Sequence, residues 1–437
     1  MVLVEKTVEI LRKCPLCDSC LGRQFALLGK GVANSARGRA LKLIAVMELH
    51  QRYLSGDEQA RKCLEELAGN GVAFAATILG KEVTEGECFI CRGLMSRLDE
   101  LARQALPELE QYEYSTFLVG VKMHGDYVER EDKLRAEFQL EYGESIKGEF
   151  TREVGKRLVA LTGKKADLEK PDMIIIFNLV ENRVEITPMP LFIAGRYRKL
   201  VRGIPQARWI CTECGGRGCE RCNWSGKMYP TSVEELIAEP ILRAAKGLEA
   251  KFHGAGREDV DVRVLGNGRP FVVEVKYPRI RQLDLEELAK TINQHAKGLV
   301  EVTELKYGDR KLVRRLKLMS ERSPKKYRAV IEVEKPISHE DLRKLEEYFK
   351  DRVIEQYTPR RVLHRRADKL RRKKVYEVEV KPIGERMFEA LIKCQGGLYV
   401  KELISGDEGR TTPSFSEMLG RSARCIELDV VEVGGEV

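Results

Sequence analysis

The sequence lacks any apolar run close to the roughly 20 residues that cross a membrane as a helix. Its first residues, MVLVEKTVEILRKC, lack the apolar core and the small-residue cleavage site of a secretory signal peptide. There is also no internal repeat and no low-complexity tract. These absences argue against a membrane-spanning, a secreted or a repeat protein, and we expect a cytoplasmic one.

Familiar cofactor and nucleic-acid signatures are missing as well. The chain has neither a GxxxxGK[ST] loop nor a GxGxxG motif after a strand, which argues against ATP-dependent and methyl-donor chemistry. It has no RRM, KH or homeodomain signature. Any affinity for nucleic acid therefore has to be argued from the charge pattern.

Charge is abundant. Among 437 residues, 33% are charged against a typical value of roughly 25%, aromatic residues make up only 7%, and the net charge is +9. This length predicts two or three domains. The mix of Lys, Arg and Glu suits surface ion-pair networks of the kind found in thermophiles, and the basic excess favours a phosphate-bearing partner.

Two basic segments concentrate that excess. PRRVLHRRADKLRRKK, residues 359–374, holds nine Lys or Arg and a single acid, and GRYRKLVRGIPQAR spans residues 195–208. A solvated face is the plain alternative. However, arginine forks onto phosphates bidentately, and two segments in different domains would let a long polyanion such as tRNA bridge them, with binding that weakens as salt rises. The predicted RNA contacts are Arg196, Arg198, Lys199, Arg202, Arg360, Arg361, Arg365 and Arg366.

The hydrophobic period divides the chain into three parts. Residues 1–112 carry apolar positions at helical spacing. Over 113–230, strands such as YSTFLVGVKM alternate with the amphipathic IKGEFTREVGKRLVALTG, which predicts an α/β module. Residues 231–437 mix strands with helices. The fold class we expect is α+β, with one large, mostly antiparallel sheet in the last part.

Within that last part, individual segments are predicted from their period. SVEELIAEPILRAAKGLEA should be a helix with Ser232 as its N-cap and Glu235 completing a capping box. The basic run 359–374 should form a long hairpin or loop. Further helices are LEELAKTINQHAK and HEDLRKLEEYFK, and the strands are RPFVVEVKY, YRAVIEVEKPI, KVYEVEVKPI, LYVKELI and IELDVVEV.

Eight of the twelve cysteines fall into CxxC pairs. Cys211, Cys214, Cys219 and Cys222 form CxxC-x4-CxxC with glycines between, which lets a short chain turn four thiolates onto one zinc ion. Two disulfides or a redox CxxC are the alternatives, but no thioredoxin-like βαβ unit follows. Four thiolates leave no open position for water, so the role predicted for this site is structural.

A second cysteine set is less defined. Cys88 and Cys91 could join a CxxC near the N-terminus, but CPLC (14–17) and CDSC (17–20) both qualify, so two registers stay open. Isolated buried cysteines are the alternative to zinc here. Three remaining cysteines are most simply small core residues, namely Cys63, Cys394 and Cys425.

The stretch KFHGAGREDVDVRVLGNGRPFVVEV, residues 251–275, crowds acids and bases into a glycine-rich loop between a helical-looking approach and an apolar strand. Enzymes that act on polyanions place an acid where several cations keep it ionised. By composition alone, a salt-bridged turn between a helix and a strand fits slightly better. The charged residues in question are Arg257, Glu258, Asp259, Asp261, Arg263 and Arg269.

GREDVDVRVLGNGRPF resembles the signature of the archaeal Pus10 family of tRNA pseudouridine synthases, and its GRED core is similar to the catalytic loop of pseudouridine synthases in general. KKY at 325–327 resembles their K-x-Y motif, and GGLYVKELISGDEGRTTPS at 396–414 their G-T-Y segment with a following basic residue. TPRRVLHRRADKLRRKK, SVEELI, GRYRKLVRGIPQ, CDSCLGRQFA and CFICRG resemble further Pus10 stretches. The likeness covers nearly the whole chain, although Leu398 stands where the family often has threonine.

This resemblance implies a fold and a reaction. Residues from about 115 to 205 should be a THUMP-type RNA-binding module, and Cys17 and Cys20 rather than Cys14 should join Cys88 and Cys91 in a zinc site. The motif at 211–222 looks like an archaeal elaboration. The implied reaction converts uridines 54 and 55 of the tRNA TΨC arm to pseudouridine, with no cofactor for catalysis, with zinc in a structural role, and with a monomer sufficient.

The resemblance also implies residue roles. Asp259 would be the catalytic carboxylate, Lys401 its basic partner and Tyr327 the residue that stacks on the uracil. RNA contacts near the loop would come from Arg257, Arg263 and Tyr399. If the chain is extended after Asp259, Asp261 points the other way and pairs with Arg263 or Arg269.

Two other functions stay open. One is a different THUMP-bearing tRNA enzyme, such as a thiolase or a methyltransferase, which the missing nucleotide and methyl-donor loops disfavour. The other is a non-catalytic, zinc-containing tRNA-binding or RNA chaperone protein, which the CxxCxGxG-like element and the basic runs would also fit. That reading predicts that Asp259→Asn changes nothing but stability.

Overall fold

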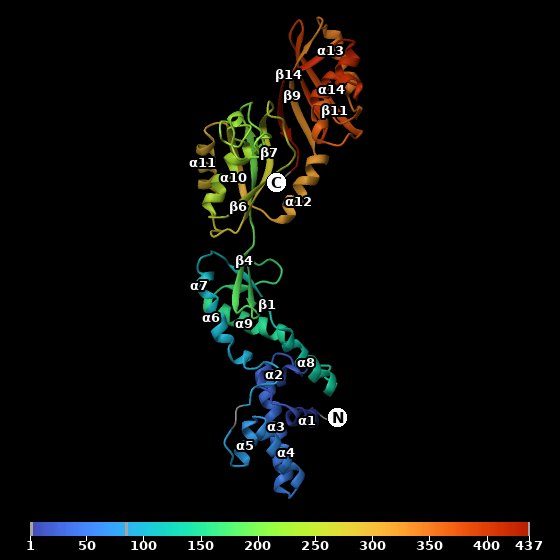
Figure 1. The fold of residues 1–437 in the computed structure, drawn as a ribbon. Helices are drawn as coiled ribbons and strands as arrows, with labels where there is room; N and C mark the ends of the chain where they lie inside the picture. The colour runs from blue at the N-terminus through green and yellow to red at the C-terminus, as the bar shows by residue number, and fades with distance from the viewer. Residues whose placement is uncertain (1–2, 84–85, 436–437) are drawn as a thin grey trace. The chain divides into compact units, whose positions relative to one another are not determined.

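The computed structural model describes residues 3–83 and 86–435, with the side chains of residues 320–322 and 365 outside that description. The chain divides into two compact units, Met1–Met189 and Pro190–Val437 (Figure 1). Each unit is described by itself. The domain limits predicted at 112/113 and 230/231 stay predictions.

The first unit begins with helices, as predicted. The helix α2 (Asp18–Arg23) crosses α3 (Asn34–Leu54) at two glycines. A Cβ atom on Gly22 would lie 1.9 Å from the Asn34 carbonyl oxygen, and one on Gly38 would lie 1.9 Å from the Asp18 carbonyl oxygen, so neither position tolerates a side chain. The other helices of this region are α1 (Leu3–Lys13), α4 (Glu58–Gly69), α5 (Ala73–Ile78), η1 (Leu94–Ser96), α6 (Leu98–Gln104) and α7 (Leu106–Leu109).

A small sheet completes this unit. Its strand order is β2-β1-β3-β4, with β1 parallel to both neighbours and β4 antiparallel to β3. Helix α9 buries Phe150 against the sheet, where its ring lies 5.9 Å from that of Phe177. The elements are β1 (Thr116–Lys122), α8 (Gly125–Phe138), α9 (Ile146–Thr162), β2 (Lys165–Ala166), β3 (Met173–Asn178) and β4 (Arg183–Pro188).

The second unit is built on a large sheet, whose ten strands among the described residues run in the order β13-β10-β11-β12-β9-β14-β7-β5-β8, with β6 paired to β7. Neighbours pair antiparallel except β14 and β7, which are parallel. The predicted α+β class and mostly antiparallel sheet are confirmed. The strands are β5 (Leu191–Lys199), β6 (Glu249–Gly254), β7 (Arg263–Lys276), β8 (Val300–Tyr307), β9 (Pro324–Val333), β10 (Val353–Gln356), β11 (Arg371–Gly384), β12 (Met387–Gln395), β13 (Thr411–Thr412) and β14 (Ala423–Val433).

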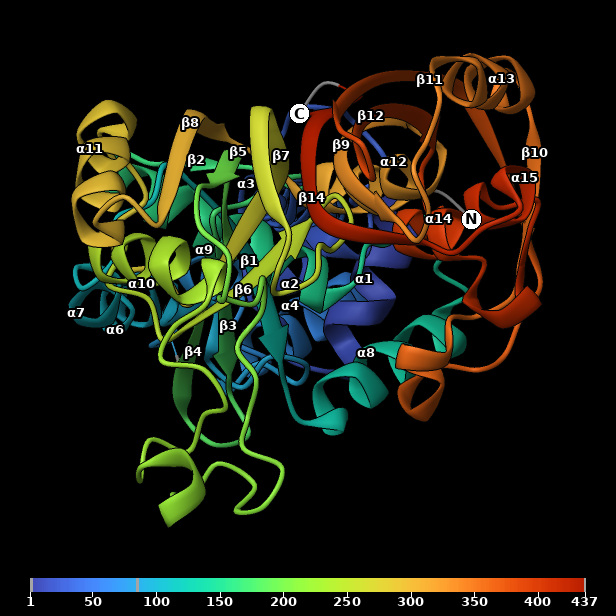
Figure 2. The ribbon, with the colours of Figure 1, turned by 90° about the horizontal axis from the view of Figure 1, so that it is seen from above.

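Helices cover both faces of this sheet. Alternate residues of β7 face opposite ways: Val273 packs in the main core with α10 (Val233–Ala244) and α11 (Leu285–Ala296), whereas Val272 packs with Leu316 of α12 (Arg310–Arg322). In Figure 2, α10 and α11 lie beside β8, and α13 (His339–Phe349) and α15 (Phe415–Leu419) lie near β10. The predicted N-cap is confirmed, because the Ser232 hydroxyl accepts a hydrogen bond from the amide of Glu235.

Two predictions of secondary structure need correction. The segment LYVKELI is not a strand but contains the helix α14 (Val400–Ser405), which buries Val400, Leu403 and Ile404 at helical spacing. The approach to the charged loop is the strand β6 rather than a helix. The basic run, predicted as a long hairpin or loop, does connect two antiparallel strands, β10 and β11, and contains the short helix η3 (Arg360–Arg365) before it enters β11. No helix of the described chain has the length and apolar character needed to cross a bilayer.

Candidate active site

The charged loop, residues 255–262, joins β6 to β7 and is held through its backbone. The buried Lys199 Nζ donates to the carbonyl oxygens of Asp259 and Val260 at 3.1 and 2.9 Å. Burial lowers the pKa of Lys199 to about 8. The amide of Gly203 also donates to the Val260 oxygen, at 2.9 Å. The loop therefore keeps its path whatever side chain it carries at 259.

Glu258 anchors the loop on its buried side. Its carboxylate is fully buried, accepts from the Tyr197 hydroxyl at 2.9 Å and from Gln206 Nε2 at 3.2 Å, and lies 3.0 Å from Arg269 Nε. Burial, followed by the Glu258 charge, raises the pKa of Tyr197. A buried carboxylate with this many partners is a structural anchor, and the residue after it is left to face the solvent side.

Asp259 lines a cavity of about 1040 Å³. The cavity is large enough for a nucleotide, and its wall combines charged and aromatic side chains with aliphatic ones such as Val262, Leu398 and Val430. Residues from the loop, β9, η3 and the start of α14 meet in it, including Arg257, Asp259, Lys325, Tyr327, Arg361, Arg366, Tyr399 and Lys401.

Two cations hold the Asp259 carboxylate. Arg361 Nη1 lies 2.8 Å from Oδ2, and Lys401 Nζ lies 3.6 Å from the same oxygen. Arg361 is itself fixed by a 2.6 Å hydrogen bond from Nε to Glu402 Oε1. The predicted neighbour Lys401 is therefore close, but the closer cation is Arg361, for which the sequence had predicted only an RNA contact.

The predicted pairing of Asp261 is wrong. Its oxygens lie 2.7 and 2.8 Å from Lys401 Nζ, whereas Arg263 Nη2 lies 2.8 Å from Asp429. The reason is local: a hydrogen bond of 3.1 Å from the Val262 amide to the Asp259 oxygen closes a turn, so the alternation of an extended chain does not apply. Burial acts to raise the pKa of Asp261, but Lys401 outweighs it and the pKa is lowered.

Tyr327 and Tyr399 face the cavity from different elements. Tyr327 lies on β9 and is partly buried against the main core, and burial raises its pKa. Tyr399 precedes α14. Its backbone is bracketed by Gln356, which accepts from its amide at 2.8 Å and donates to its carbonyl oxygen at 3.0 Å. The Tyr399 hydroxyl accepts from Arg366 Nη1 at 2.8 Å.

Known proteins resemble this chain in sequence over almost its full length. Residues 192–434 match the family described as Pus10, C-terminal, and residues 101–178 match the Pus10 THUMP domain, archaeal. The tRNA pseudouridine synthase Pus10 of Methanothrix thermoacetophila is 47% identical over 99% of this chain and 95% of its own. That of Methanocaldococcus jannaschii is 46% identical over 97% and 93%. The chain belongs to the Pus10 family of tRNA pseudouridine synthases.

Similarity to solved structures is weaker. A Cbf5-Nop10-Gar1 complex matches at 16% identity with a TM-score of 0.31, over 55% of this chain and 49% of that one. This degree of likeness adds nothing to the family assignment. The Pus10 match places a THUMP domain over the small sheet of the first unit, and the C-terminal match begins with β5.

The predicted RNA contacts of this Pus10 member fall into two groups. Arg257, Arg361, Arg366 and Tyr399 line the cavity. The other predicted contacts lie outside the cavity lining, except that the side chain of Arg365 is not among those that the structure describes. Buried Arg196 donates to the Gly268 oxygen at 3.0 Å, buried Lys199 holds the loop, Arg202 and Arg263 pair with Asp429, Arg198 pairs with Glu301 at 2.7 Å, and Arg360 pairs with Glu408 at 2.6 Å.

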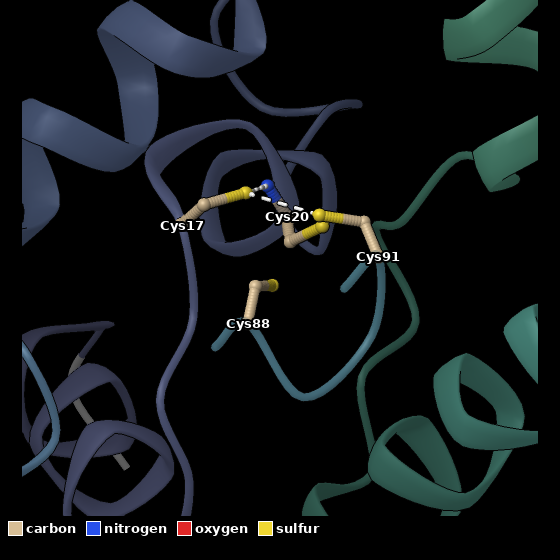
Figure 3. A group of neighbouring side chains, drawn as sticks. All are labelled: Cys17, Cys20, Cys88 and Cys91. Atoms are coloured by element: carbon tan, nitrogen blue, oxygen red, sulfur yellow. Dashed lines mark hydrogen bonds between the residues drawn. The ribbon is translucent and has the colours of Figure 1, made fainter. Parts of the chain in front are cut away.

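The eight CxxC cysteines form two groups of four. In each group the four sulfur atoms lie within 4.8 Å of one another. The first joins Cys17 and Cys20 of the α2 end to Cys88 and Cys91, and Figure 3 shows the four side chains converging. Cys14 stands apart, with its thiol 3.9 Å from the Ile10 oxygen. The second consists of Cys211, Cys214, Cys219 and Cys222.

Sulfur spacing in both groups fits zinc. Cys17 and Cys91 are 3.7 Å apart, Cys211 and Cys219 3.8 Å, and Cys214 and Cys222 3.9 Å. Thiolates around tetrahedral zinc, bound at about 2.3 Å, lie about 3.8 Å from one another. A disulfide would need about 2.05 Å. Both groups could therefore hold a zinc ion with four thiolates.

The second group also reaches the active site. The segment before Cys211 is tied to the segment after Cys222 by hydrogen bonds of 2.9 Å from the Met228 amide to the Trp209 oxygen and from the Cys211 amide to the Gly226 oxygen. The Trp209 ring packs edge-on against Tyr229 at 5.4 Å, lines the cavity, and has the Arg257 guanidinium 5.6 Å from its centroid. The cysteine group thus fixes one wall of the cavity.

Sequence reasoning missed three groups in the cavity wall or beside it. It did not foresee Arg361 as the nearest cation to Asp259 or Glu402 as the residue that orients Arg361, and it gave the buried Lys325 no role although this lysine opens the K-x-Y motif. Only Lys325 had a usable signal, because residues two apart on a strand share a face and Tyr327 was already expected at the active site.

Proposed function

We propose that this chain isomerises uridines 54 and 55 in the TΨC arm of tRNA to pseudouridine, with Asp259 as the catalytic carboxylate. The observation that carries the proposal is the position of Asp259. In a member of the Pus10 family, its carboxylate lines a nucleotide-sized cavity with Arg361 at 2.8 Å, Lys401 at 3.6 Å and a tyrosine in the same cavity.

The reaction breaks the bond between C1′ of the ribose and N1 of the uracil, turns the ring, and joins C5 to C1′. No atoms are gained or lost and no electrons are transferred, so the chemistry calls for no cofactor. Asp259 serves as nucleophile toward C1′ or as base toward the ribose, and both roles need the ionised form. Two cations within 4 Å favour that form.

Tyr327 stacks on the uracil after the nucleotide has been turned out of its loop. Stacking on an aromatic ring contributes about 1–3 kcal/mol, which offsets much of the few kcal/mol needed to unstack the base. Arg257, Arg366 and Tyr399 contact the RNA around the cavity, since all three line it. The exposed remainder of the basic run 359–374 extends this contact along the phosphate backbone.

Each cysteine group holds one structural zinc ion. Four thiolates close the coordination shell, so neither ion has an open position for substrate or water. All twelve cysteines are free of disulfides, which suits a reducing compartment, and we place the protein in the cytoplasm. A single chain supplies every group named in the reaction.

Tritium release tests the proposal. A tRNA transcript labelled at C5 of uridine is incubated with native protein, with Asp259→Asn and with the matched variant Asp261→Asn, which changes a carboxylate in the same loop. Bond formation at C5 expels the label, so native protein and Asp261→Asn should release it and Asp259→Asn should not. Mapping of the product positions then tests uridines 54 and 55.

The competing function is tRNA binding without catalysis. If native protein binds the transcript with high, salt-sensitive affinity but releases no tritium, the isomerase proposal fails and the binding function replaces it. Release by Asp259→Asn at the native rate would instead leave an isomerase whose catalytic carboxylate is a different residue.

A further inference from the structure

Lys325 is a buried cation without a counterion in the active-site cavity. It lies near the start of β9, is 5% exposed and lines the cavity. Within residues 3–83 and 86–435, no hydrogen bond or ion pair engages its ammonium group. Buried charges are normally paired, because an unpaired one loses its hydration without compensation. The exception therefore calls for an explanation.

The groups around Lys325 do not supply a partner. Glu258, the nearby carboxylate, is engaged by Tyr197, Gln206 and Arg269. Burial lowers the pKa of Lys325 to about 7, and the charge of Arg269 acts in the same direction. Cys394 and Glu258 oppose this shift less strongly, and Lys373 adds a still weaker lowering. The protein thus holds a positive group here at a cost, and the open side of that group is the cavity.

Lys325 and Tyr327 face the same way. They are two residues apart on β9, a spacing of about 6.6 Å that puts both side chains on one face of the sheet, and both line the cavity. Lys326, between them, points away and lies 3.4 Å from Glu379. A base resting against Tyr327 is therefore within reach of the Lys325 ammonium.

We propose that Lys325 binds the uracil ring, donating a hydrogen bond to one of its carbonyl oxygens and balancing the charge that the ring carries while it is detached. This inference rests on the proposed isomerase function. When C1′–N1 breaks, the electron pair leaves with the ring, and its negative charge spreads over N1 and the carbonyl oxygens. Once C5 has bonded to C1′, the C5 hydrogen leaves as a proton and N1 takes one up, so the charge disappears.

The test compares Lys325→Met with Lys325→Arg, and uses Lys326→Met as a matched control. Single-turnover tritium release should fall at least 100-fold in Lys325→Met, while the Kd for tRNA stays within threefold of native. Lys326→Met should match the native protein in both. The melting temperature of Lys325→Met should rise by a few degrees, since an uncompensated buried charge has been removed.

A pH profile separates this role from a purely structural one. The kcat/KM of the native protein should fall as the pH rises above about 7, because the protonated lysine is the active form in the free enzyme. Lys325→Arg keeps its charge at every pH tested. Lys325→Arg should therefore react at least tenfold faster than Lys325→Met, and its kcat/KM should not fall as the pH rises above 7.

Each result bears on one idea. Release by Lys325→Met within threefold of native would overturn the inference and leave the isomerase standing. A loss of rate matched by an equal loss of tRNA affinity or of folded protein would assign Lys325 to structure. No release by the native protein would overturn the isomerase proposal, and this inference with it.

Discussion

Two carboxylates of the larger unit are each surrounded by cations, yet they differ in what else they touch. Asp429 on β14 is fully buried. Arg202 lies 2.7 Å from one of its oxygens, and Arg263 and Arg328 lie 2.8 and 3.2 Å from the other. All three partners are arginines, which stay charged at any physiological pH.

Among the residues that the structure describes, Asp259 has two cationic partners, and it keeps 32% of its side-chain surface exposed. That surface opens into the cavity, where Tyr327 and Lys325 also lie. The difference teaches that the number of ion pairs does not identify a reactive carboxylate. Exposure to a cavity that also holds ionisable and aromatic side chains, here Lys325 and Tyr327, is the better guide to a reactive carboxylate.

The strongest test of this contrast is Asp259→Asn. Because the amide can neither attack the ribose nor take its proton, single-turnover tritium release should fall at least about 10³-fold. The free energy of unfolding should change by no more than about 1 kcal/mol, since the pair is partly exposed. Urea unfolding of the same preparation measures the second quantity. A large loss of stability here would break the comparison.

Asp429→Asn should do the reverse. Removing the charge leaves three guanidinium groups around a neutral amide, and breaking a buried ion network typically costs about 3–5 kcal/mol. Urea unfolding should report that loss, while tritium release per folded molecule stays within about fivefold of native. If release disappears in variant protein that remains folded, the division between a reactive and a structural carboxylate does not hold.

Arg361→Gln sharpens the contrast within the reactive site. Arg361 bridges Asp259 and Glu402, so its loss leaves Asp259 with Lys401 alone, and we expect a 10- to 100-fold lower rate. Arg360→Gln is the matched control, because its partner Glu408 is exposed and lies away from the cavity lining. Equal losses in the two variants would reduce Arg361 to an RNA contact.

A pH titration of stability separates the surroundings of Asp259 from those of Asp429, because Lys325 and Lys401 line the Asp259 cavity whereas Asp429 pairs with arginines. Lys325 has a pKa of about 7 in the folded protein and about 10.4 when unfolded, so the unfolded chain binds the proton more tightly between these values. The free energy of unfolding should therefore rise with pH from 7 toward 10, by up to about 1.4 kcal/mol per unit. Lys325→Met should lose the rise that begins near pH 7 and keep the part that begins near pH 8, which Lys199 contributes.

At low pH, the same titration of the free energy of unfolding measures the contribution of Asp429 to stability. Its pKa is lowered in the folded protein, because Arg263 and Arg202 outweigh the opposing effect of burial. Its contribution is present above the unfolded pKa of about 3.9 and disappears as the pH falls below it. Asp429→Asn should flatten that acid limb and leave the alkaline rise intact.

Removal of the metal should affect the cavity around Asp259 before it affects the ion network around Asp429. The second cysteine group fixes Trp209, which lines the cavity, whereas Asp429 is held by β14 and its arginines. A chelator should lower the melting temperature and weaken tRNA binding about threefold to tenfold before it reduces the single-turnover rate of bound tRNA. Loss of that rate with RNA still bound would contradict a purely structural role for zinc.

Much of the fold could be predicted from the sequence because apolar periodicity reports burial directly. The alternation in RPFVVEVKY and the helical spacing in LEELAKTINQHAK both gave the right element, β7 and α11. LYVKELI misled because its β-branched and aromatic residues favour a strand, while the helical burial of Val400, Leu403 and Ile404 depends on contacts that only the folded unit supplies.

The residues of the candidate active site were predicted only where a motif included them, and their catalytic roles stay predictions. Asp259, Tyr327 and Lys401 were expected there, and all three line one cavity. Arg361 lies in a run of basic residues that look alike in sequence, so its approach to Asp259 could not be told from the others. The partner of Asp261 was mistaken because one hydrogen bond closes a turn, which no alternation rule anticipates.

The charged loop, residues 255–262, is held by its carbonyl oxygens rather than by the side chain at 259. Lys199 Nζ donates to the carbonyl oxygens of residues 259 and 260, and the amide of Gly203 donates to that of residue 260. Arg202 Nη1 donates to the Asp261 carbonyl oxygen at 2.8 Å. A duplicated gene that lost Asp259 would thus retain the loop, the cavity and the basic surface. With the role that we propose for Asp259, a single codon change would convert this enzyme into a paralogue that binds tRNA without modifying it.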